Sequence, residues 1–460
     1  MDKKHFNHFK NIVGEENIYE DKAHLIAYSY DATREHFEPD AVLFPRSEED
    51  ISNILKYCNE NQIIIVPRGA GSGFTGGAIP SEGGIVLAFE RYMNKILEID
   101  MQNMVAVVQP GVINMDLQKA VEEVGLFYPP DPASQDYSTI GGNVNENAGG
   151  MRAAKYGITK DYVMAIRAVL PNGDIIKAGK RTIKDVAGYN ISGILIASEG
   201  TLAVTTEVTL KLLSKPKLTK TAMGIFDSVT QAMEAVYKTM AGGVTPVAME
   251  FLDNLTIRAV EQTYNKGLPV EAGAILVTDV DGNLEDDLNF QLDLIERIFK
   301  ENGCSEFKRA QNDAEAADLW FARRNASQCL SIYGSKKLNE DVTVPRAVLP
   351  ELLTAFNGIA EKYNINIPCF GHTGDGNVHT NVMVDGSDPE QVKIAYQAIE
   401  EVFQATVDLG GTLSGEHGIG IAKAPYMGMA FTDEEMNLFN TIKSAFDPNN
   451  ILNPHKMGLK

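Results

Sequence analysis

The sequence lacks a long apolar run and has few cysteines, and both absences exclude classes of protein. No stretch approaches the roughly 18 apolar residues of a membrane-spanning helix, and the start has no apolar signal-peptide region. The cysteines are scattered and form no C-x-x-C pair: Cys58, Cys304, Cys329 and Cys369. This spacing excludes a disulfide framework, a zinc knuckle and a resident iron–sulfur cluster. We therefore expect a cytoplasmic protein, with a partner as the means of any peripheral attachment to the inner membrane.

Basic residues are also scarce. The chain has 41 Lys and Arg against 62 Asp and Glu, which gives a formal net charge of −21. Because nucleic-acid binding depends on clustered Lys and Arg, this balance argues against a nucleic-acid partner. It also disfavours direct binding to an anionic membrane surface. An anionic substrate would need local positive charge at its site.

The composition is that of a folded protein of two or three domains, with 460 residues, 44% hydrophobic and 22% charged. From residue 41 to about 213, short β-like runs alternate with amphipathic helices. Ser47, followed by Asp50, predicts a helix start. We expect buried strands over residues 63–67, 84–88 and 105–108, and a further helix over 115–124. The linker-like segment 214–217 predicts boundaries that divide the chain into residues 1–214, 215–410 and 411–460.

A glycine-rich loop follows the first of these strands. Residues 69–77 contain five glycines, and Gly71, Gly73 and Gly76 form a G-x-G-x-x-G pattern. A Rossmann fold would require a helix to start there, and Pro80 with the two glycines that follow it excludes that helix. The exposed backbone N–H groups still suit a pyrophosphate, whereas a simple turn needs only one or two glycines. We therefore expect dinucleotide binding without a Rossmann fold.

Two further segments rich in small residues and amides support this interpretation. The first runs from Pro130 and Asp131 through residues 138–143 to residues 147–150, and the second is residues 198–202. Such residues make poor core material and are suited to lining a flat polar ring system.

The last fifth of the chain gathers histidines and a glutamate among glycines. His372 and His379 flank the turn-forming residues 374–377, and Glu416 and His417 follow later. Two imidazoles and a carboxylate suit a borderline divalent metal such as zinc, manganese or iron. His417 is then left for proton transfer. The alternatives are structural histidines, and a Glu416–His417 pair that only hydrogen-bonds a loop.

Taken in order, these segments resemble the FAD-binding oxidases of the vanillyl-alcohol oxidase and p-cresol methylhydroxylase type. More narrowly, they resemble the glycolate oxidase flavoprotein subunit and the FAD-linked D-lactate and D-2-hydroxyglutarate dehydrogenases. The resemblance implies an α+β fold: an FAD-binding domain of two subdomains over residues 1–214, and a cap domain over 215–410 that supplies the substrate pocket. Residues 411–460 would complete the active site.

The resemblance also implies which residues contact FAD. They are Pro67, Arg68, Gly69, Ala70, Gly71, Ser72, Gly73, Thr75, Gly76, Gly77, Pro130, Asp131, Ser138, Thr139, Gly141, Gly142, Asn143, Asn147, Gly149, Gly150, Glu199, Gly200 and Asn453. Relatives with covalent flavin often carry a histidine in or near the glycine loop. Residues 67–80 contain none, so we expect non-covalent FAD.

The implied activity is oxidation of a D-2-hydroxy acid by an FAD-linked dehydrogenase or oxidase. The resemblance places a divalent metal (Zn, Mn or Fe) on His372, His379 and Glu416. His417 would be the general base, Arg323 would bind the substrate carboxylate, and Asn377 would orient a ligand. Electrons would pass to an iron–sulfur subunit, an electron-transferring flavoprotein or a quinone. A homodimer is also compatible with the sequence.

One departure bears on the substrate. Hydroxyglutarate-type relatives carry a lysine where this chain has Asn339, and Lys336 and Lys337 are out of register. Without that second cation a distal carboxylate is poorly held, which favours lactate or glycolate. D-2-hydroxyglutarate oxidation, a metal-free flavoprotein transferase and a non-catalytic flavin subunit of an electron-transfer complex are the alternatives.

Overall fold

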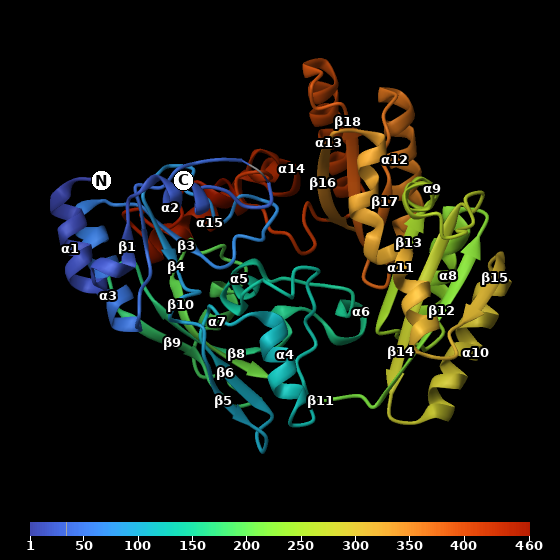
Figure 1. Ribbon diagram of the computed structural model, residues 1–460, viewed down its shortest axis with the longest axis horizontal. Helices are drawn as coiled ribbons and strands as arrows, with labels where there is room; N and C mark the ends of the chain where they lie inside the picture. Colours follow the sequence, from blue (N-terminus) through green and yellow to red (C-terminus); the bar gives the residue numbers. More distant parts are fainter. Residues whose placement is uncertain (34) are drawn as a thin grey trace. The chain divides into compact units, whose positions relative to one another are not determined.

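The computed structural model describes residues 1–33 and 35–460, which divide into two compact units (Figure 1). The first unit comprises residues 1–149, 157–215 and 416–460, and the second comprises residues 150–156 and 216–415. Within the described residues, no helix combines the length and the apolar character needed to cross a membrane.

The first unit begins with a four-stranded sheet in the order β1-β2-β4-β3, in which β4 runs parallel to β2 and β3. Its strands are β1 (Ile18–Tyr19), β2 (Ala41–Leu43), β3 (Ile65–Arg68) and β4 (Ile85–Ala88). Its helices are α1 (Lys3–Val13), the 3-10 turn η1 (Glu15–Asn17), α2 (Lys22–Ala27) and α3 (Glu48–Asn61). As predicted, Ser47 caps α3 by accepting a hydrogen bond from the Asp50 N–H at 3.2 Å. The helix buries Ile51, Ile54, Leu55 and Cys58 against the sheet.

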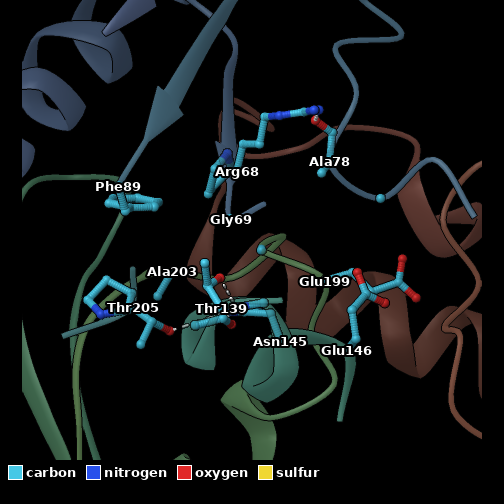
Figure 2. A pocket seen from close by; sticks show the side chains of 16 residues that line it. Arg68, Gly69, Ala78, Phe89, Thr139, Asn145, Glu146, Glu199, Ala203 and Thr205 are labelled. Carbon is cyan, nitrogen blue, oxygen red and sulfur yellow. Dashed lines mark hydrogen bonds between the residues drawn. The ribbon is translucent and has the colours of Figure 1, made fainter. Parts of the chain in front are cut away.

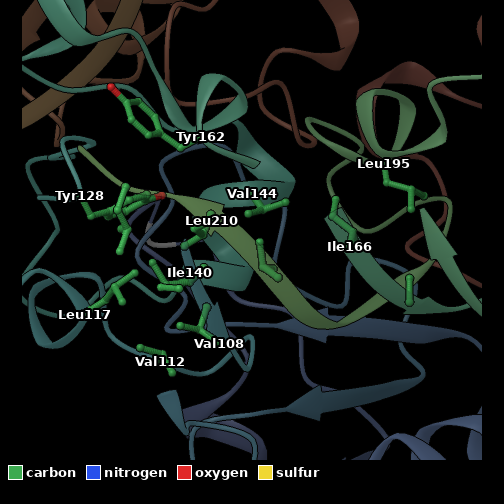
Figure 3. Packing of buried hydrophobic residues seen from close by; sticks show 14 of the residues in the cluster. Val108, Val112, Leu117, Tyr128, Ile140, Val144, Tyr162, Ile166, Leu195 and Leu210 are labelled. Carbon is green, nitrogen blue, oxygen red and sulfur yellow. The ribbon is translucent and has the colours of Figure 1, made fainter. Parts of the chain in front are cut away.

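A five-stranded antiparallel sheet in the order β5-β6-β10-β8-β9 forms the rest of this unit. Its strands are β5 (Ile96–Asp100), β6 (Val105–Val108), β8 (Val163–Val169), β9 (Ile175–Gly179) and β10 (Val204–Lys211). The associated helices are α4 (Asn114–Glu122), α5 (Ile140–Glu146), η2 (Thr159–Asp161) and α7 (Ile191–Leu195), with the small ribbon β7 (Leu126–Phe127) and β11 (Leu213–Ser214) beside them. Apolar side chains of α4, α5 and α7 pack on the strands, which fixes the position of α5 (Figure 3).

The C-terminal segment belongs to this first unit, and Figure 1 shows both chain ends within it. Its elements are η5 (Ala424–Tyr426), α14 (Met427–Ala430), α15 (Asp433–Phe446) and η6 (Lys456–Gly458). Leu452 pairs with Ile65 in a parallel bridge, so residues 451–453 extend the edge of the first sheet beside β3. The buried Lys443 donates to Asp447 at 2.5 Å and to the carbonyls of Thr201 and Leu452 at 2.8 Å.

The second unit is a seven-stranded sheet in the order β15-β12-β14-β13-β17-β18-β16, and every neighbouring pair is antiparallel. Its strands are β12 (Leu218–Phe226), β13 (Ala248–Asp253), β14 (Ala274–Gly282), β15 (Cys304–Arg309), β16 (Lys336–Thr343), β17 (Cys369–His372) and β18 (Asn377–Val384). Its helices are α6 (Ala153–Tyr156), α8 (Val229–Ala241), α9 (Asn254–Tyr264), α10 (Glu285–Glu301), α11 (Asp313–Cys329), η3 (Leu330–Tyr333), η4 (Arg346–Val348), α12 (Leu349–Tyr363) and α13 (Pro389–Asp408).

Strand register gathers polar side chains on one face of this sheet. Phe370 packs in the cluster formed with α9 and α11, and it lies directly opposite His379. Because side chains alternate along a strand and opposite residues share a face, His372 and its partner Glu250 lie on that same face. The α9–α11 face therefore carries the predicted histidine pair.

Candidate active site

The glycine loop continues from β3 without forming a helix, as predicted. The loop lies very close to its neighbours in the first unit. A Cβ on Gly69 would collide with Oγ1 of Thr139, and a Cβ on Gly77 would lie 2.8 Å from Oε1 of Glu146. At Gly69 a side chain has no room beside the short Thr139 side chain, whereas at Gly77 the end of the longer Glu146 side chain would have to move.

A cavity in the first unit is lined by this loop, by α5 and by the turn before β10 (Figure 2). Nine of its lining residues are predicted FAD contacts: Pro67, Arg68, Gly69, Gly77, Thr139, Gly141, Gly142, Glu199 and Gly200. The others are residues that the sequence analysis missed: Ala78, Phe89, Pro110, Asn145, Glu146, Ala203 and Thr205. Asn145 and Glu146 lie between the predicted FAD contacts Asn143 and Asn147, and this position in the sequence could have identified them as lining residues.

The Arg68 guanidinium ties the loop to the rest of the unit. It donates to the carbonyls of Ala78 at 3.2 Å and Tyr30 at 2.8 Å. Burial lowers the pKa of Arg68, against the attraction of Asp31. Arg68 thus braces the far side of the loop as well as lining the cavity.

The remaining loop residues are outside the lining of this cavity: Ala70, Gly71, Ser72, Gly73, Thr75 and Gly76. Some of them form hydrogen bonds to other segments of the first unit. The Gly76 N–H donates to Asp31 at 2.9 Å, and the Thr75 carbonyl accepts from Ile421 and Ala422.

The other predicted FAD contacts occupy several places. The Pro130 carbonyl accepts from Asn114 and Gln118, while Asp131, Ser138 and Asn143 are buried. Asn147 follows the last residue of α5 with a left-handed backbone conformation, and its side chain accepts a hydrogen bond from the Lys160 N–H. Gly149 is the last residue of the first segment of the first unit, and Gly150 is the first residue of the second unit. Asn453 donates to the carbonyls of Gly77 at 2.8 Å and Glu199 at 2.6 Å, so it joins two walls of the cavity.

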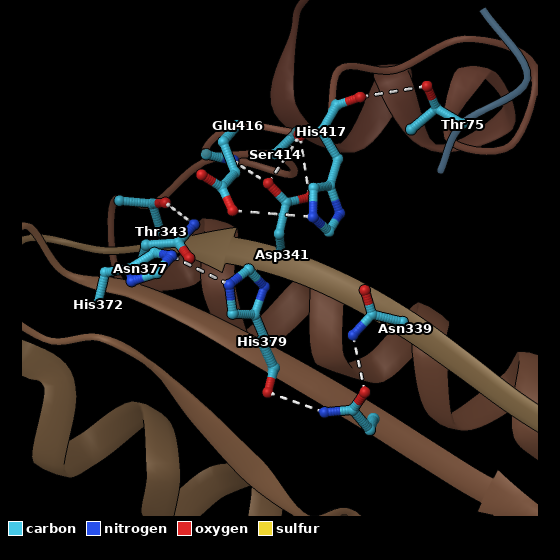
Figure 4. Close-up of polar contacts among 12 residues, drawn as sticks. Thr75, Asn339, Asp341, Thr343, His372, Asn377, His379, Ser414, Glu416 and His417 are labelled. Atoms are coloured by element: carbon cyan, nitrogen blue, oxygen red, sulfur yellow. Dashed lines mark hydrogen bonds and ion pairs between the residues drawn. The ribbon is translucent and has the colours of Figure 1, made fainter. Parts of the chain in front are cut away.

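The segment that follows Glu416 is anchored on the first unit. Thr75 Oγ1 donates to the His417 carbonyl at 3.2 Å (Figure 4). The rings of Phe74 and His417 lie 5.1 Å apart. The Ile419 and Gly420 N–H groups each donate to the Glu199 carboxylate at 2.7 Å. The backbone of this segment is therefore fixed beside the glycine loop.

In the second unit, the two predicted metal-binding histidines converge. Nε2 of His372 lies 3.3 Å from Nε2 of His379, and both side chains are buried (Figure 4). Two nitrogens at about 2.0–2.1 Å from a tetrahedral zinc ion would be about 3.3 Å apart. The pair therefore has the spacing of two ligands of one ion.

Glu250 orients the first of these histidines. Its Oε1 lies 2.6 Å from Nδ1 of His372, and the Glu250 side chain is fully buried. A carboxylate on the far nitrogen fixes the tautomer and ring direction of a metal-binding histidine. The other carboxylate oxygen of Glu250 accepts a hydrogen bond from Nε of Arg323 at 2.7 Å.

Arg323 therefore lies next to the histidine pair, in the same unit. Its guanidinium also lies over the Phe370 ring, 4.8 Å from the centroid. The neighbouring Arg324 is exposed.

The segment leading to Glu416 is held on the second unit up to Gly415. The buried Asp341 accepts hydrogen bonds from Ser414 Oγ at 3.0 Å and from the Gly415 N–H at 2.9 Å. Asn377 donates to Thr343 at 3.0 Å, on the same strand pair (Figure 4). Glu416 is the next residue of the chain and belongs to the first unit, as does His417.

Two asparagine side chains near His379 form hydrogen bonds to each other and to the backbone. Asn339 donates to Asn381 at 2.7 Å, and Asn381 donates to the carbonyls of Pro368 and His379 at 3.2 Å each. Lys337 is exposed and donates to Ser327 Oγ at 2.7 Å. The sequence analysis missed Asn381 and Glu250. A lone glutamate in the buried strand Ala248–Asp253 was the signal for the latter.

Comparison with known proteins gives matches over both halves of the chain. Residues 39–179 match the family model described as an FAD binding domain, and residues 215–457 match that of the C-terminal domain of FAD linked oxidases. The chain is 44% identical to the glycolate oxidase subunit GlcD of Bacillus subtilis (strain 168), covering 98% of this chain and 95% of that protein. It is 35% identical to the D-lactate dehydrogenase of Anaerostipes hadrus, covering 98% and 94%. The structure of p-cresol methylhydroxylase with substrate bound matches with a TM-score of 0.82 and 18% identity, covering 100% of this chain and 98% of that one.

The predicted fold is confirmed, and the cavity fits the cofactor of such a fold. The p-cresol methylhydroxylase type of FAD-binding domain is followed by a C-terminal α+β domain. Gly69 and Gly77 both line the cavity, and Gly69 lies so close to Thr139 that the loop can present only bare backbone at that position. Backbone N–H groups of this kind suit the pyrophosphate of FAD.

Proposed function

Because this chain belongs to the family of FAD-linked oxidases, and is an FAD-linked oxidoreductase, we propose that it oxidises D-lactate or glycolate to the 2-oxo acid. Bound FAD supplies the hydride acceptor, its N5 atom. Residues 67–80 contain no histidine, which supports non-covalent binding. The observation that carries the proposal is the convergence of His372 and His379, at 3.3 Å, with Glu250 behind them.

His372, His379 and Glu416 would hold a divalent metal, zinc, manganese or iron. Two buried imidazoles with ligand spacing, one of them backed by a buried carboxylate, support this part of the proposal. When bound, such an ion lowers the pKa of a coordinated hydroxyl group. The short connection from Gly415, held by Asp341, to Glu416 is consistent with a ligand from that residue.

His417 would accept the substrate hydroxyl proton. Its backbone is fixed by Thr75, so the imidazole is carried on a rigid segment. Imidazole is suited to this step because it titrates near neutral pH. Arg323 would bind the substrate carboxylate through the part of its fork that Glu250 does not use. Asn377 would orient a ligand from the strand that carries His379.

The paired amides support a small substrate. Asn339 is engaged by Asn381, and Lys337 is engaged by Ser327, so neither offers a second fixed cation for a distal carboxylate. D-2-hydroxyglutarate is therefore disfavoured. The scattered cysteines support an acceptor outside this chain, an iron–sulfur or flavin protein or a quinone.

Anaerobic bleaching of the flavin absorbance at about 450 nm tests the proposal. D-lactate, glycolate and D-2-hydroxyglutarate would each be added to the metal-loaded holoprotein, with and without prior chelation. We expect D-lactate or glycolate to bleach the flavin and chelation to abolish the effect. An FAD- and metal-loaded protein that none of the three acids reduces would contradict the proposal.

A further inference from the structure

A second hollow in the first unit adjoins the cofactor cavity and has no part in the function described so far. It has a volume of about 1090 Å³, and it is walled by β8, β9, the start of α7 and the exposed arm, residues 180–190. Glu146 lines the cofactor cavity, whereas the next residue, Asn147, lines the hollow. Glu199 and Ala197 are divided between the two cavities in the same way. A molecule in the hollow therefore lies behind a wall of the FAD site.

The exposed arm carries apolar side chains that the described part of the chain leaves in solvent. Every residue of the arm is exposed, and none belongs to a helix or strand. Ile183, Val186 and Tyr189 are 94%, 98% and 93% exposed. Single exposed apolar residues are ordinary on a protein surface, but a group of them in one short segment marks an interaction site.

Lysines outnumber acidic residues in the hollow, although the chain as a whole has a net charge of −21. Two aspartates line it, and both accept backbone hydrogen bonds: Asp161 from the Ile158 N–H and Asp185 from the Ala187 N–H. Four lysines line it, and none of them forms an ion pair with any residue of 1–33 or 35–460: Lys160, Lys177, Lys180 and Lys211. The hollow therefore presents positive charge that an acidic surface would complement.

We propose that the exposed arm and the lysines of the hollow form the docking surface for the protein that accepts electrons from the flavin, and that this partner docks through an acidic face. The inference rests on the proposed function and selects a protein, an iron–sulfur or flavin protein, as the outside acceptor. The two electrons that the flavin receives as hydride pass to the partner, and the proton of that hydride passes to water.

The shape of the surface favours a protein over a membrane. A hollow accepts protruding side chains, whereas a lipid surface is flat and anionic and would repel a chain of net charge −21. Apolar residues at the centre of a protein interface contribute affinity, and charges at its rim raise the association rate. Ile183 and Tyr189, which line the hollow, suit the first role, and the exposed Lys177 and Lys180 suit the second.

Electron transfer to a small acidic b-type cytochrome, one electron per molecule, tests the surface. The flavin would be reduced by light and a deazaflavin, so that neither hydroxy acid nor metal is needed. Lys177→Gln/Lys180→Gln removes two exposed charges, and Lys3→Gln/Lys4→Gln on α1 is the matched control. At an ionic strength of about 20 mM, we expect the second-order rate constant to fall about 5- to 20-fold in the first variant and to stay within about twofold in the control. The difference should vanish at about 0.5 M salt, where charges are screened.

The apolar part of the surface has a separate readout. Ile183→Ser should weaken binding of the cytochrome by about 3- to 10-fold at every salt concentration, because burial of apolar area is not screened. Ile26→Ser, at a position on α2 that is 45% exposed, is the control. The flavin spectrum and the urea midpoint of each variant show that it is folded and loaded with FAD.

Equal rates for the lysine variant and its control at low ionic strength would overturn the inference, and so would a reduced wild-type protein that does not reduce the acidic cytochrome. Binding to phosphatidylserine vesicles that the lysine variant loses would assign the surface to a membrane, and a dimer that Ile183→Ser dissociates would assign it to a second copy. Either result would also overturn it. Failure of the hydroxy acids to reduce the flavin contradicts only the proposed substrate, because photoreduction replaces them here.

Discussion

At the residue scale, Glu250 links two predicted site residues of the second unit. One carboxylate oxygen orients His372 and the other accepts a hydrogen bond from Arg323. The side chain is fully buried, which is tolerated because both oxygens are engaged by charge-compatible partners. The predicted metal ligand and the predicted substrate-binding arginine are thus positioned by one residue.

We expect Glu250→Gln to weaken divalent-metal binding by about 10- to 100-fold, because the amide is a poorer partner for the far nitrogen of His372. The affinity can be measured by competition with a chromophoric chelator. Glu234→Gln, an exposed position on α8, is the matched control. If Glu250→Gln binds zinc and manganese as tightly as the wild type does, Glu250 serves only to position Arg323.

Sequence could identify the histidines but not the residue that orients them. His372 and His379 are separated by a glycine-rich turn, so their convergence follows from local chain geometry. Glu250 lies 122 residues from His372 and meets it only because β13 pairs with β17. Such a pairing is set by the whole sheet, and no local pattern encodes it.

At the element scale, caps determine where helices begin, and local sequence predicts them well. The helix predicted from Ser47 is α3, and the strands expected near residues 63–67, 84–88 and 105–108 are β3, β4 and β6. The helix expected over 115–124 is α4, which begins one residue earlier and ends at Glu122. The order of the seven-stranded sheet was not predictable, because it joins strands distant in sequence.

Removing the cap of α3 should cost about 1 kcal/mol of unfolding free energy. Ser47→Ala leaves the Asp50 N–H without its side-chain acceptor, whereas Ser47→Asp retains an acceptor at the helix start, where negative charge is favourable. Urea unfolding monitored by circular dichroism measures the difference. Equal midpoints for the alanine and aspartate variants would rule out a contribution from this cap.

Because of Asp253 at the start of α9, we expect the free energy of unfolding to depend on pH. Its carboxylate accepts the Thr256 N–H at 2.8 Å and the Cys369 N–H at 2.7 Å. Burial nevertheless raises its pKa from 3.8 to about 6. A raised pKa in the folded state means that this group's stabilisation is complete below pH 3.8 and is lost as the pH rises through about 6.

The stability difference between wild type and Asp253→Asn should therefore shift against the wild type as the pH rises from 4 to 7. Urea midpoints of the two proteins across this range provide the measurement. Using the difference removes the contributions of other carboxylates, which are common to both proteins. A difference that stays constant with pH would contradict the raised pKa.

At the scale of the whole molecule, neither unit is a continuous stretch of chain. The chain passes between units after Gly149, Tyr156, Lys215 and Gly415. The C-terminal residues 416–460 return to the first unit and contribute Ile451 and Leu452 to its core. The same segment supplies the Ile419 and Gly420 donors to Glu199.

Truncation after Gly415 should therefore abolish FAD retention even though residues 1–215 contain the glycine loop. Without Asn453 the carbonyls of Gly77 and Glu199 lose their shared donor, and without Lys456 the carbonyls of Gly76 and Ile79 lose theirs. Several buried acceptors would be left unpaired, each costing about 1–3 kcal/mol. Flavin content after gel filtration measures retention, and a protein lacking only the exposed Lys460 is the control. A truncated protein that keeps stoichiometric FAD would show that the glycine loop holds its shape without the C-terminal segment.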